Sequence, residues 1–311
     1  MARKRRIKQV RREGWYHVYC KVAGSKGEYP LANSLCQKNL IGLLRFYARA
    51  YCCEISAFSV MGNHYHLVIK FEARRELSRA ELLRRARVLY PNSGNLLKCW
   101  PMVKWKQFEK RLFDLSKFMH NFQTAYAQWF NRHHERLGRF WGDRFKSTLL
   151  QDLAAVRDCM LYVDLNPVRG GLVNRPEDYK ACSYYLRTIG KGDWLKPLED
   201  FETYKSAKQA LRDYRGRLYY RGSVPTKKGQ AAIPRAIVAS EKAMGFKTPG
   251  MYRERLRYFV DGVVLGSEEF VRDYLKKLKK EGYYLRRKNP ISHLAGLHVT
   301  LREQRSHATA W

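Results

Sequence analysis

The sequence is short of acidic residues, paired cysteines and long apolar runs, and each shortage excludes a class of protein. Its 311 residues hold 28 Asp and Glu against 61 Lys and Arg, a net charge of +33. This imbalance excludes an ordinary metabolic enzyme with a neutral or acidic surface. The 7 cysteines form no Cys-x-x-Cys pair, so we expect a reduced intracellular chain without a disulfide framework or zinc site. No run of about eighteen apolar residues occurs, so no membrane span is expected.

What the sequence does have is strong positive charge on a chain that can fold. Hydrophobic residues make up 45% of it and aromatic residues 14%, which excludes a fully disordered protein. Positive charge of this size favours a polyanionic partner, most often nucleic acid. Aromatic faces beside Arg and Lys suit unpaired bases, and they also fill cores.

The N-terminal part of the chain shows strand and helix patterns in a clear order. Runs of aromatic and β-branched residues predict strands over 15–23, 55–60 and 64–71, and leucines at helical spacing predict a helix over 34–51. The pair Gly62-Asn63 predicts a turn between the last two strands. The order strand, helix, strand, hairpin, strand predicts an α+β fold, a ferredoxin-like antiparallel sheet with flanking helices.

The remaining patterns are mainly helical. Helices are expected over 78–90, 106–134, 153–165 and 267–280. Asp152 can cap the third of these helices, and Pro167 is expected to close it.

The composition shifts toward Lys/Arg-rich helices and linkers near residue 190. We therefore expect a basic N-terminal arm at 1–12, one domain at 13–190, and a basic, mainly helical DNA-binding region at 191–311. In the arm, Arg3, Lys4, Arg5 and Arg6 are candidate phosphate contacts, and a solvated tail is the alternative.

A second basic segment, residues 138–145, interleaves charge with aromatic side chains. Arg139, Arg144 and Lys146 flank Trp141 and Phe145 there, which predicts a DNA-contacting stretch. A buried aromatic turn with exposed charge explains the same pattern equally well.

Two pairs of residues carry the chemistry. His64 and His66 lie at i and i+2 of a predicted strand, so both imidazoles point to one face, about 7 Å apart at Cα, and can converge on one ion. Tyr162 and Asn166 lie at i and i+4 of a predicted helix and share a face, which offers a phenol nucleophile and an amide ligand together. Each pair also has an alternative interpretation without a catalytic role. The histidines could be two unrelated surface residues, and Tyr162 could be an ordinary tyrosine of an amphipathic helix.

Three segments resemble one family. Met61-Gly-Asn-His-Tyr-His-Leu-Val-Ile69, Gly138-Arg-Phe-Trp-Gly-Asp-Arg-Phe145 and Leu161-Tyr-Val-Asp-Leu-Asn-Pro-Val-Arg-Gly170 resemble the bacterial REP-associated tyrosine transposases, which are single-tyrosine HUH transposases and nucleases. The resemblance covers about residues 13 to 190. It implies that His64 and His66 are metal ligands, Tyr162 the nucleophile and Asn166 a third ligand. The middle residue of the HxH motif is a bulky Tyr65 instead of a small aliphatic residue, and it is expected to face away from the metal.

The resemblance implies a function as well as a site. It implies an endonuclease and strand transferase, dependent on Mg²⁺ or Mn²⁺, that forms a 5′-phosphotyrosine at single-stranded DNA with palindromic REP-like hairpins. It also implies a protein of the bacterial cytoplasm and nucleoid, working as a monomer or a homodimer. Two alternatives stay open: a non-catalytic nucleic-acid-binding protein that keeps the fold, and a nickase of the rolling-circle initiator type.

Overall fold

The protein is an α+β molecule built on one mixed sheet, in a computed structural model that describes residues 9, 12–25, 27–225, 229–243, 262–281, 291–292 and 298–301. The strands are β1 (Gly14–Lys21), β2 (Cys53–Val60), β3 (His64–Phe71), β4 (Lys146–Leu150), β5 (Gly262–Gly266), β6 (Ile291–Ser292) and β7 (His298–Leu301). Their order is β2-β3-β1-β4-β5-β7-β6, and the neighbours pair antiparallel except for the parallel pair β4 and β5.

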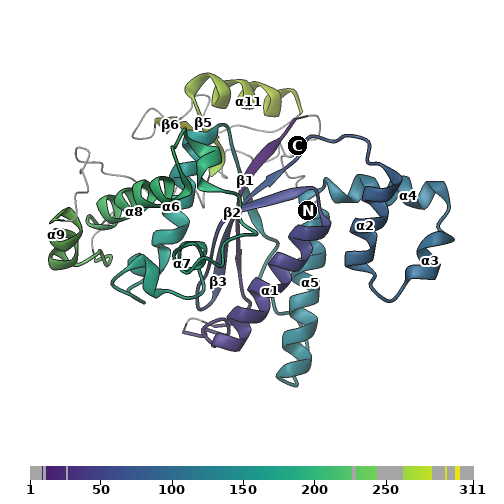
Figure 1. The fold of residues 1–311 in the computed structure, drawn as a ribbon, viewed down its shortest axis with the longest axis horizontal. Helices are drawn as coiled ribbons and strands as arrows, with labels where there is room; N and C mark the ends of the chain where they lie inside the picture. The colour runs from purple at the N-terminus through teal and green to yellow at the C-terminus, as the bar shows by residue number, and fades with distance from the viewer. Residues whose placement is uncertain are drawn as a thin grey trace, which may run out of the picture.

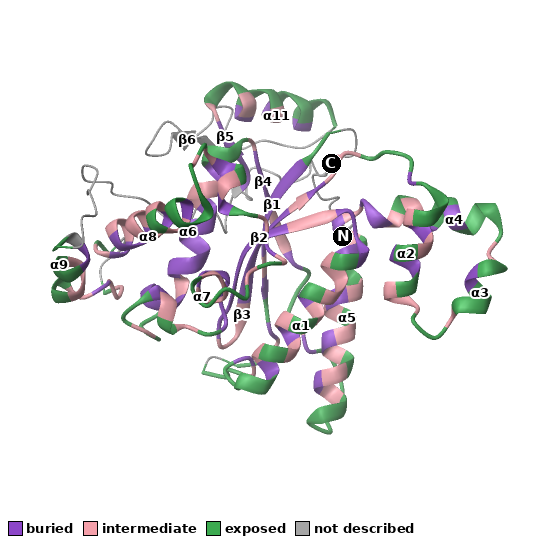
Figure 2. Ribbon diagram, in the orientation of Figure 1, coloured by how far each residue is buried: buried purple, intermediate pink, exposed green. Residues whose placement is uncertain are grey.

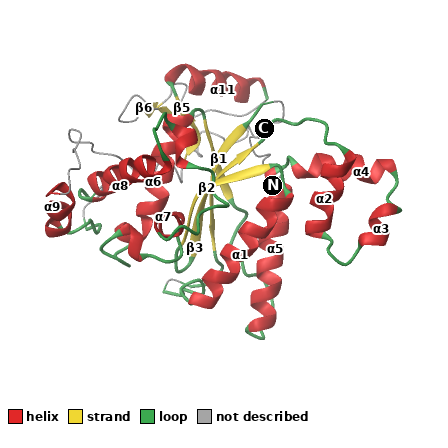
Figure 3. Cartoon of the chain, in the orientation of Figure 1, coloured by secondary structure: helices red, strands yellow, loops and turns green. Residues whose placement is uncertain are grey.

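Helices surround this sheet (Figure 1; Figure 3). The longer ones are α1 (Ser34–Ala50), α2 (Arg79–Leu89), α4 (Met102–Leu112), α5 (Leu115–His133), α6 (Leu153–Arg169), α8 (Ala207–Gly222), α9 (Arg235–Ala243) and α11 (Glu268–Lys280). The shorter ones are α3 (Gly94–Lys98), α7 (Ser183–Thr188), and two 3₁₀ turns at Pro176–Asp178 and Leu198–Phe201.

The two faces of the sheet bury different cores because side chains alternate along each strand. On one face, Val18 and Leu67 join a core with α1 and α5. On the other, Trp15 and Val68 join a core with α6, α7 and α8. Figure 2 shows the inner helix faces buried and the outer faces exposed. The sheet thus holds α6 on the opposite face from α1 and α5.

The helix predicted over 106–134 is wrong in extent, because the chain breaks into α4 and α5. The Asp114 carboxylate accepts hydrogen bonds from the backbone N–H groups of Ser116 and Lys117, at 2.7 and 3.3 Å. This cap starts a new helix where the apolar spacing alone suggested a continuous one. The predicted cap of α6 by Asp152 is confirmed, and Asn33 caps α1.

Helix α6 runs past Pro167 to Arg169, so Pro167 does not close it as expected. Proline lacks a backbone N–H, but its loss is tolerable in the last turn of a helix whose end is capped otherwise. The backbone N–H of Gly170 donates to the Asn166 carbonyl at 2.8 Å and completes that turn. Asn166 is therefore held within regular helix, on the same side as Tyr162.

Helices α2, α3 and α4 form a lobe with a small core of its own. Leu82, Leu97, Trp105 and Phe108 are buried in this core. In Figure 1 the lobe projects from the sheet on the side of α1 and α5. The guanidinium carbon of Arg79 lies 3.9 Å from the centroid of the Trp105 ring.

The sequence predicted a mainly helical region after residue 190. In the structure this region also contributes strands to the sheet. Strand β5 pairs with β4, and Val264 and Leu265 are completely buried. Helix α8 packs in the same core as α6. A domain boundary near 190 stays a prediction. No described helix is both long enough and apolar enough to cross a bilayer.

Candidate active site

Strand β3 presents the two histidines on the face covered by α6. Tyr65, between them, is buried in the opposite core, where its hydroxyl accepts a hydrogen bond from the Gln123 side chain at 2.8 Å. This confirms the expectation that Tyr65 points away from the histidines. The ring centroids of His64 and His66 are 5.1 Å apart, with the planes nearly perpendicular.

Helix α6 brings Tyr162 onto the same histidines. The centroids of the Tyr162 and His66 rings are 5.4 Å apart, edge to face, and Tyr162 is only 7% exposed. Asn166, one turn later, donates from Nδ2 to the Tyr162 backbone carbonyl at 3.0 Å. The structure therefore brings Tyr162 against His66, which adjoins His64, and places Asn166 beside Tyr162, all within one chain.

Strand β1 adds three residues that sequence reasoning missed. His17, Tyr19 and Lys21 alternate along β1, and β1 pairs with β3, so their side chains share the face of His64 and His66. The centroid of the Tyr19 ring lies 5.3 Å from that of His64 and 5.1 Å from that of His66. The spacing of His, Tyr and Lys at i, i+2 and i+4 of a predicted strand was the available signal.

Both candidate ligands are hydrogen-bonded through Nδ1. Nδ1 of His64 lies 2.8 Å from Oδ1 of Asn63. Nδ1 of His66 lies 3.0 Å from Nε2 of His17, and both of these rings are buried. Such partners fix the orientation of each imidazole ring.

Burial keeps both imidazoles neutral. Desolvation, reinforced by the charge of Lys21, lowers the pKa of His64 to about 4. Desolvation and the neighbouring His64 and His17 hold the pKa of His66 well below its usual range. Neutral imidazole is the form that binds a metal ion.

Tyr162 is buried as a neutral phenol. Desolvation raises its pKa above the ordinary value near 10, while the charge of Arg169 and a hydrogen bond with the Asn166 side chain act in the opposite direction. Arg169 is thus a further functional candidate that sequence reasoning missed. A phenol in this setting gives up its proton only when a positive group or an acceptor comes close.

Asp164 anchors the tyrosine helix from behind. Its side chain is completely buried and accepts hydrogen bonds from Ser183 Oγ at 2.6 Å, Tyr214 Oη at 2.7 Å and the Tyr184 backbone N–H at 3.2 Å. Desolvation raises its pKa to about 6. Because Ser183 belongs to α7 and Tyr214 to α8, both helices help to position Tyr162.

The donor set suits a divalent cation in part. Among the described residues, no group of three or more His, Cys, Asp or Glu side chains could hold a metal ion. Two neutral imidazoles, with Asn166 one helical turn beyond Tyr162, offer nitrogen and amide-oxygen ligands, which Mn²⁺ and, less readily, Mg²⁺ accept. A metal bound here would therefore need a neutral third ligand from the protein.

The predicted DNA-binding residues fall into three situations. Arg139 and Arg144 are exposed on the connector before β4. Lys146 opens β4 and lies nearer the site, because its Nζ is 6.0 Å from the centroid of the Tyr19 ring. The predicted contacts in the basic arm lie outside the described residues: Arg3, Lys4, Arg5 and Arg6.

Comparison with known proteins adds little to this geometry. No protein-family model and no curated protein matches the sequence. Among solved structures, that of a REP-associated tyrosine transposase bound to a REP hairpin is similar at 15% sequence identity with a TM-score of 0.37. The alignment covers 66% of this chain and 96% of that chain. A likeness of this size does not establish a shared function, so the site stands on its own geometry.

Proposed function

We propose that the protein is a metal-dependent endonuclease and strand transferase of single-stranded DNA, with Tyr162 as nucleophile. The observation that carries the proposal is the packing of Tyr162 edge-on against His66, at 5.4 Å between ring centroids, beside His64. A phenol beside two neutral imidazoles is the arrangement that tyrosine attack on a metal-bound phosphate requires.

The chain's own residues supply binding, nucleophile and charge. His64 and His66 would hold the ion, with Asn166 as the third ligand. Lys21 and Lys146, which flank the histidines on β1 and β4, would attract the phosphate backbone. When bound, Mg²⁺ or Mn²⁺ would polarise the scissile phosphate.

The proposed reaction exchanges one phosphodiester for another. Tyr162 Oη loses its proton and forms a bond to phosphorus, the bond from phosphorus to the 3′ oxygen breaks, and that oxygen takes up a proton and leaves as a 3′-OH. The products are a 5′-phosphotyrosine and a free 3′ end, so a later 3′-OH can reverse the step without ATP. The positive charge of Arg169 would favour loss of the phenol proton.

The substrate and setting that fit this proposal are a hairpin of REP-like single-stranded DNA in the bacterial cytoplasm and nucleoid. The four antiparallel strands β2-β3-β1-β4, with α1 and α5 on one face, would form the ferredoxin-like core of the proposed HUH domain. Since Tyr162 meets His66 within one chain, the site needs no residue from a second copy. Arg139, Arg144 and the arm would contact phosphates.

The test is formation of a covalent adduct. Incubation with hairpin single-stranded DNA and Mn²⁺ should give a slower band on a denaturing gel, and Tyr162→Phe or a chelator should abolish it. Tyr19→Phe is the matched control, because Tyr19 lies equally close to the histidines and should keep the adduct.

Two results would contradict the proposal and would point to a different function or a different nucleophile. Tight hairpin binding with no adduct under any metal condition would indicate a non-catalytic nucleic-acid-binding protein. An adduct lost in Tyr19→Phe and kept in Tyr162→Phe would move the nucleophile to β1.

A further inference from the structure

The Nδ1 atoms of the two proposed metal ligands have different hydrogen-bond partners. For His64 the partner is Oδ1 of Asn63, at 2.8 Å. An amide oxygen can only accept, so a neutral His64 must carry its proton on Nδ1. The lone pair of His64 is then on Nε2, the other ring nitrogen.

For His66 the partner is a second imidazole. Nδ1 of His66 and Nε2 of His17 are 3.0 Å apart, the side chains are only 2% and 1% exposed, and the ring planes are inclined by 10°. One of these two nitrogens must donate and the other accept. If His17 accepts, Nδ1 of His66 carries the proton and the lone pair of His66 is on Nε2, as in His64. If His17 donates, the lone pair of His66 is on Nδ1, where the hydrogen bond from His17 already occupies it.

We propose that His17 is a positioning residue that accepts a hydrogen bond from Nδ1–H of His66 and so keeps Nε2 of His66 available to a divalent cation. The inference rests on the proposed function, because only a bound cation gives this tautomer a use. Histidine ligands almost always donate their other ring N–H to a neighbouring group, and loss of that group costs roughly 10–100-fold in metal affinity. In this arrangement His17 is not itself a ligand, because the lone pair of its Nε2 accepts from His66 and its Nδ1 carries the proton.

A matched pair of variants separates this role from packing. His17→Gln keeps an acceptor of similar reach, whereas His17→Met has a similar length and volume but no oxygen or nitrogen acceptor. The probe is Mn²⁺ alone, titrated into the full-length protein by calorimetry. We expect His17→Met to bind Mn²⁺ about 10–100-fold more weakly than wild type and His17→Gln to stay within about threefold.

A second measurement needs no variant. Nitrogen-15 NMR of histidine-labelled, metal-free protein reports which ring nitrogen carries the proton. We expect the Nδ1–H tautomer for both His64 and His66, and loss of that preference at His66 in His17→Met. A proton on Nε2 of His66 in the wild type would overturn the inference even if His17→Met failed to fold.

The outcomes distinguish this inference from the function on which it rests. Equal Mn²⁺ affinity in wild type and His17→Met, or equal weakening in both variants, would overturn the role of His17 while the wild-type adduct left the proposed function intact. A wild type that forms no adduct and binds no Mn²⁺ would remove the proposed function and this inference together.

Discussion

Two phenols lie beside the histidine pair, and their surroundings differ. Tyr162 comes from a buried helix, next to Asn166 and Arg169. Tyr19 comes from the neighbouring strand, with Lys146 over its ring. Helix α6 is anchored through Asp164, which fixes the position of Tyr162. Rigid placement is what an attacking group needs.

Replacing Asp164 by Ala should weaken the packing of α7 and α8 against α6 and should also slow adduct formation. Three buried donors, on Ser183, Tyr184 and Tyr214, would lose their acceptor. We expect the free energy of unfolding to fall by about 3 kcal/mol, since each buried unsatisfied group costs roughly 1–3 kcal/mol. Urea denaturation measures this. Asp178→Ala, at an exposed position, is the control, and an equal small loss in both variants would contradict the anchoring role.

Asn166→Ala should affect the reaction more than the fold. It removes the side-chain hydrogen bond to the Tyr162 carbonyl and the one that acts on the phenol. We expect adduct formation to slow by roughly 10–100-fold, as for lost partners of a metal site, with a melting temperature close to that of wild type. Single-turnover kinetics at saturating Mn²⁺ would check it, and an unchanged rate would exclude Asn166 from the site.

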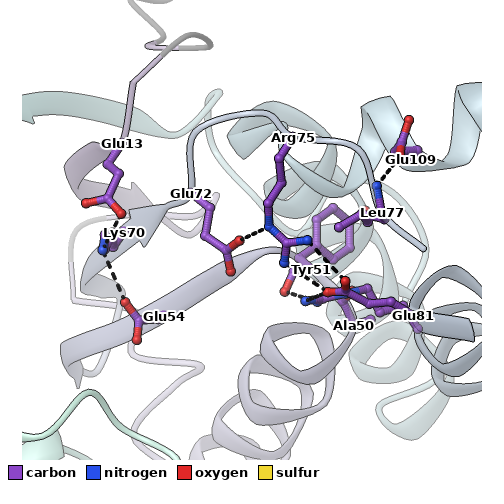
Figure 4. Close-up of polar contacts among 11 residues, drawn as sticks. Glu13, Ala50, Tyr51, Glu54, Lys70, Glu72, Arg75, Leu77, Glu81 and Glu109 are labelled. Atoms are coloured by element: carbon purple, nitrogen blue, oxygen red, sulfur yellow. Dashed lines mark hydrogen bonds and ion pairs between the residues drawn. The ribbon is translucent and has the colours of Figure 1, made fainter.

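Charged side chains connect helix α2 to the segment before it and to the end of α1. Glu81 pairs with Arg75 at 3.1 Å and with Arg85 at 2.9 Å, and Arg85 donates to the carbonyls of Ala50 and Tyr51 at the end of α1. Figure 4 shows Arg75 between Glu72 and Glu81. The ionised Glu81 thus pairs with the arginine through which α2 contacts the end of α1.

This cluster predicts a specific pH dependence. Hydrogen bonds from Arg75, together with Arg85, lower the pKa of Glu81 from 4.5 to about 2. A carboxylate with a lowered folded-state pKa stabilises the fold above its unfolded pKa and loses that contribution as the pH falls. We expect the stability difference between wild type and Glu81→Gln to be constant above pH 5 and to shrink from about pH 4.5 toward pH 2. A difference that does not change over this range, measured by urea denaturation, would contradict it.

The N-cap of α5 allows a second test of how an individual helix is stabilised. Asp114→Ala removes the acceptor for two backbone N–H groups at the start of α5. We expect a loss of about 1 kcal/mol, the usual cost of a missing N-cap. Lys117→Ala, which changes an exposed residue in the same turn, is the control, and an equal effect would show that the cap contributes nothing.

The elements that the sequence predicted well are those with long, regular patterns. The alternation over 64–71 and the leucine spacing over 34–51 predicted β3 and α1 closely. Strands β4 and β5 were missed because each has only five residues, too few for a period to show. The histidine pair, Tyr162 and Asn166 could be found from spacing. His17 shares its strand spacing with Tyr19 and Lys21, but its contact with His66 depends on strand pairing, which spacing within one strand does not predict.

At the scale of the whole molecule, the C-terminal region completes the sheet. Val263, Val264 and Leu265 of β5 are buried, and the backbone N–H of Gln151 donates to the Leu265 carbonyl at 2.9 Å. Without β5, the edge of β4 would be open to pairing with other chains. The tyrosine helix α6 follows β4 directly in the chain.

A chain shortened to end at residue 243 should therefore be less stable and more prone to aggregate. Burial of a Val or Leu side chain contributes roughly 1.5–3 kcal/mol, so loss of three such residues should cost several kcal/mol. Urea denaturation and light scattering of the shortened and full chains would show this. Equal stability and solubility would mean that β5 contributes nothing to the sheet.

The central claim is that the phenol of Tyr162 becomes covalently attached to DNA. The most direct measurement is mass spectrometry of the trapped adduct after nuclease and protease digestion. We expect one modified peptide, with a 5′-phosphonucleotide on Tyr162. A nucleotide on Tyr19, on another residue or on no residue would contradict it.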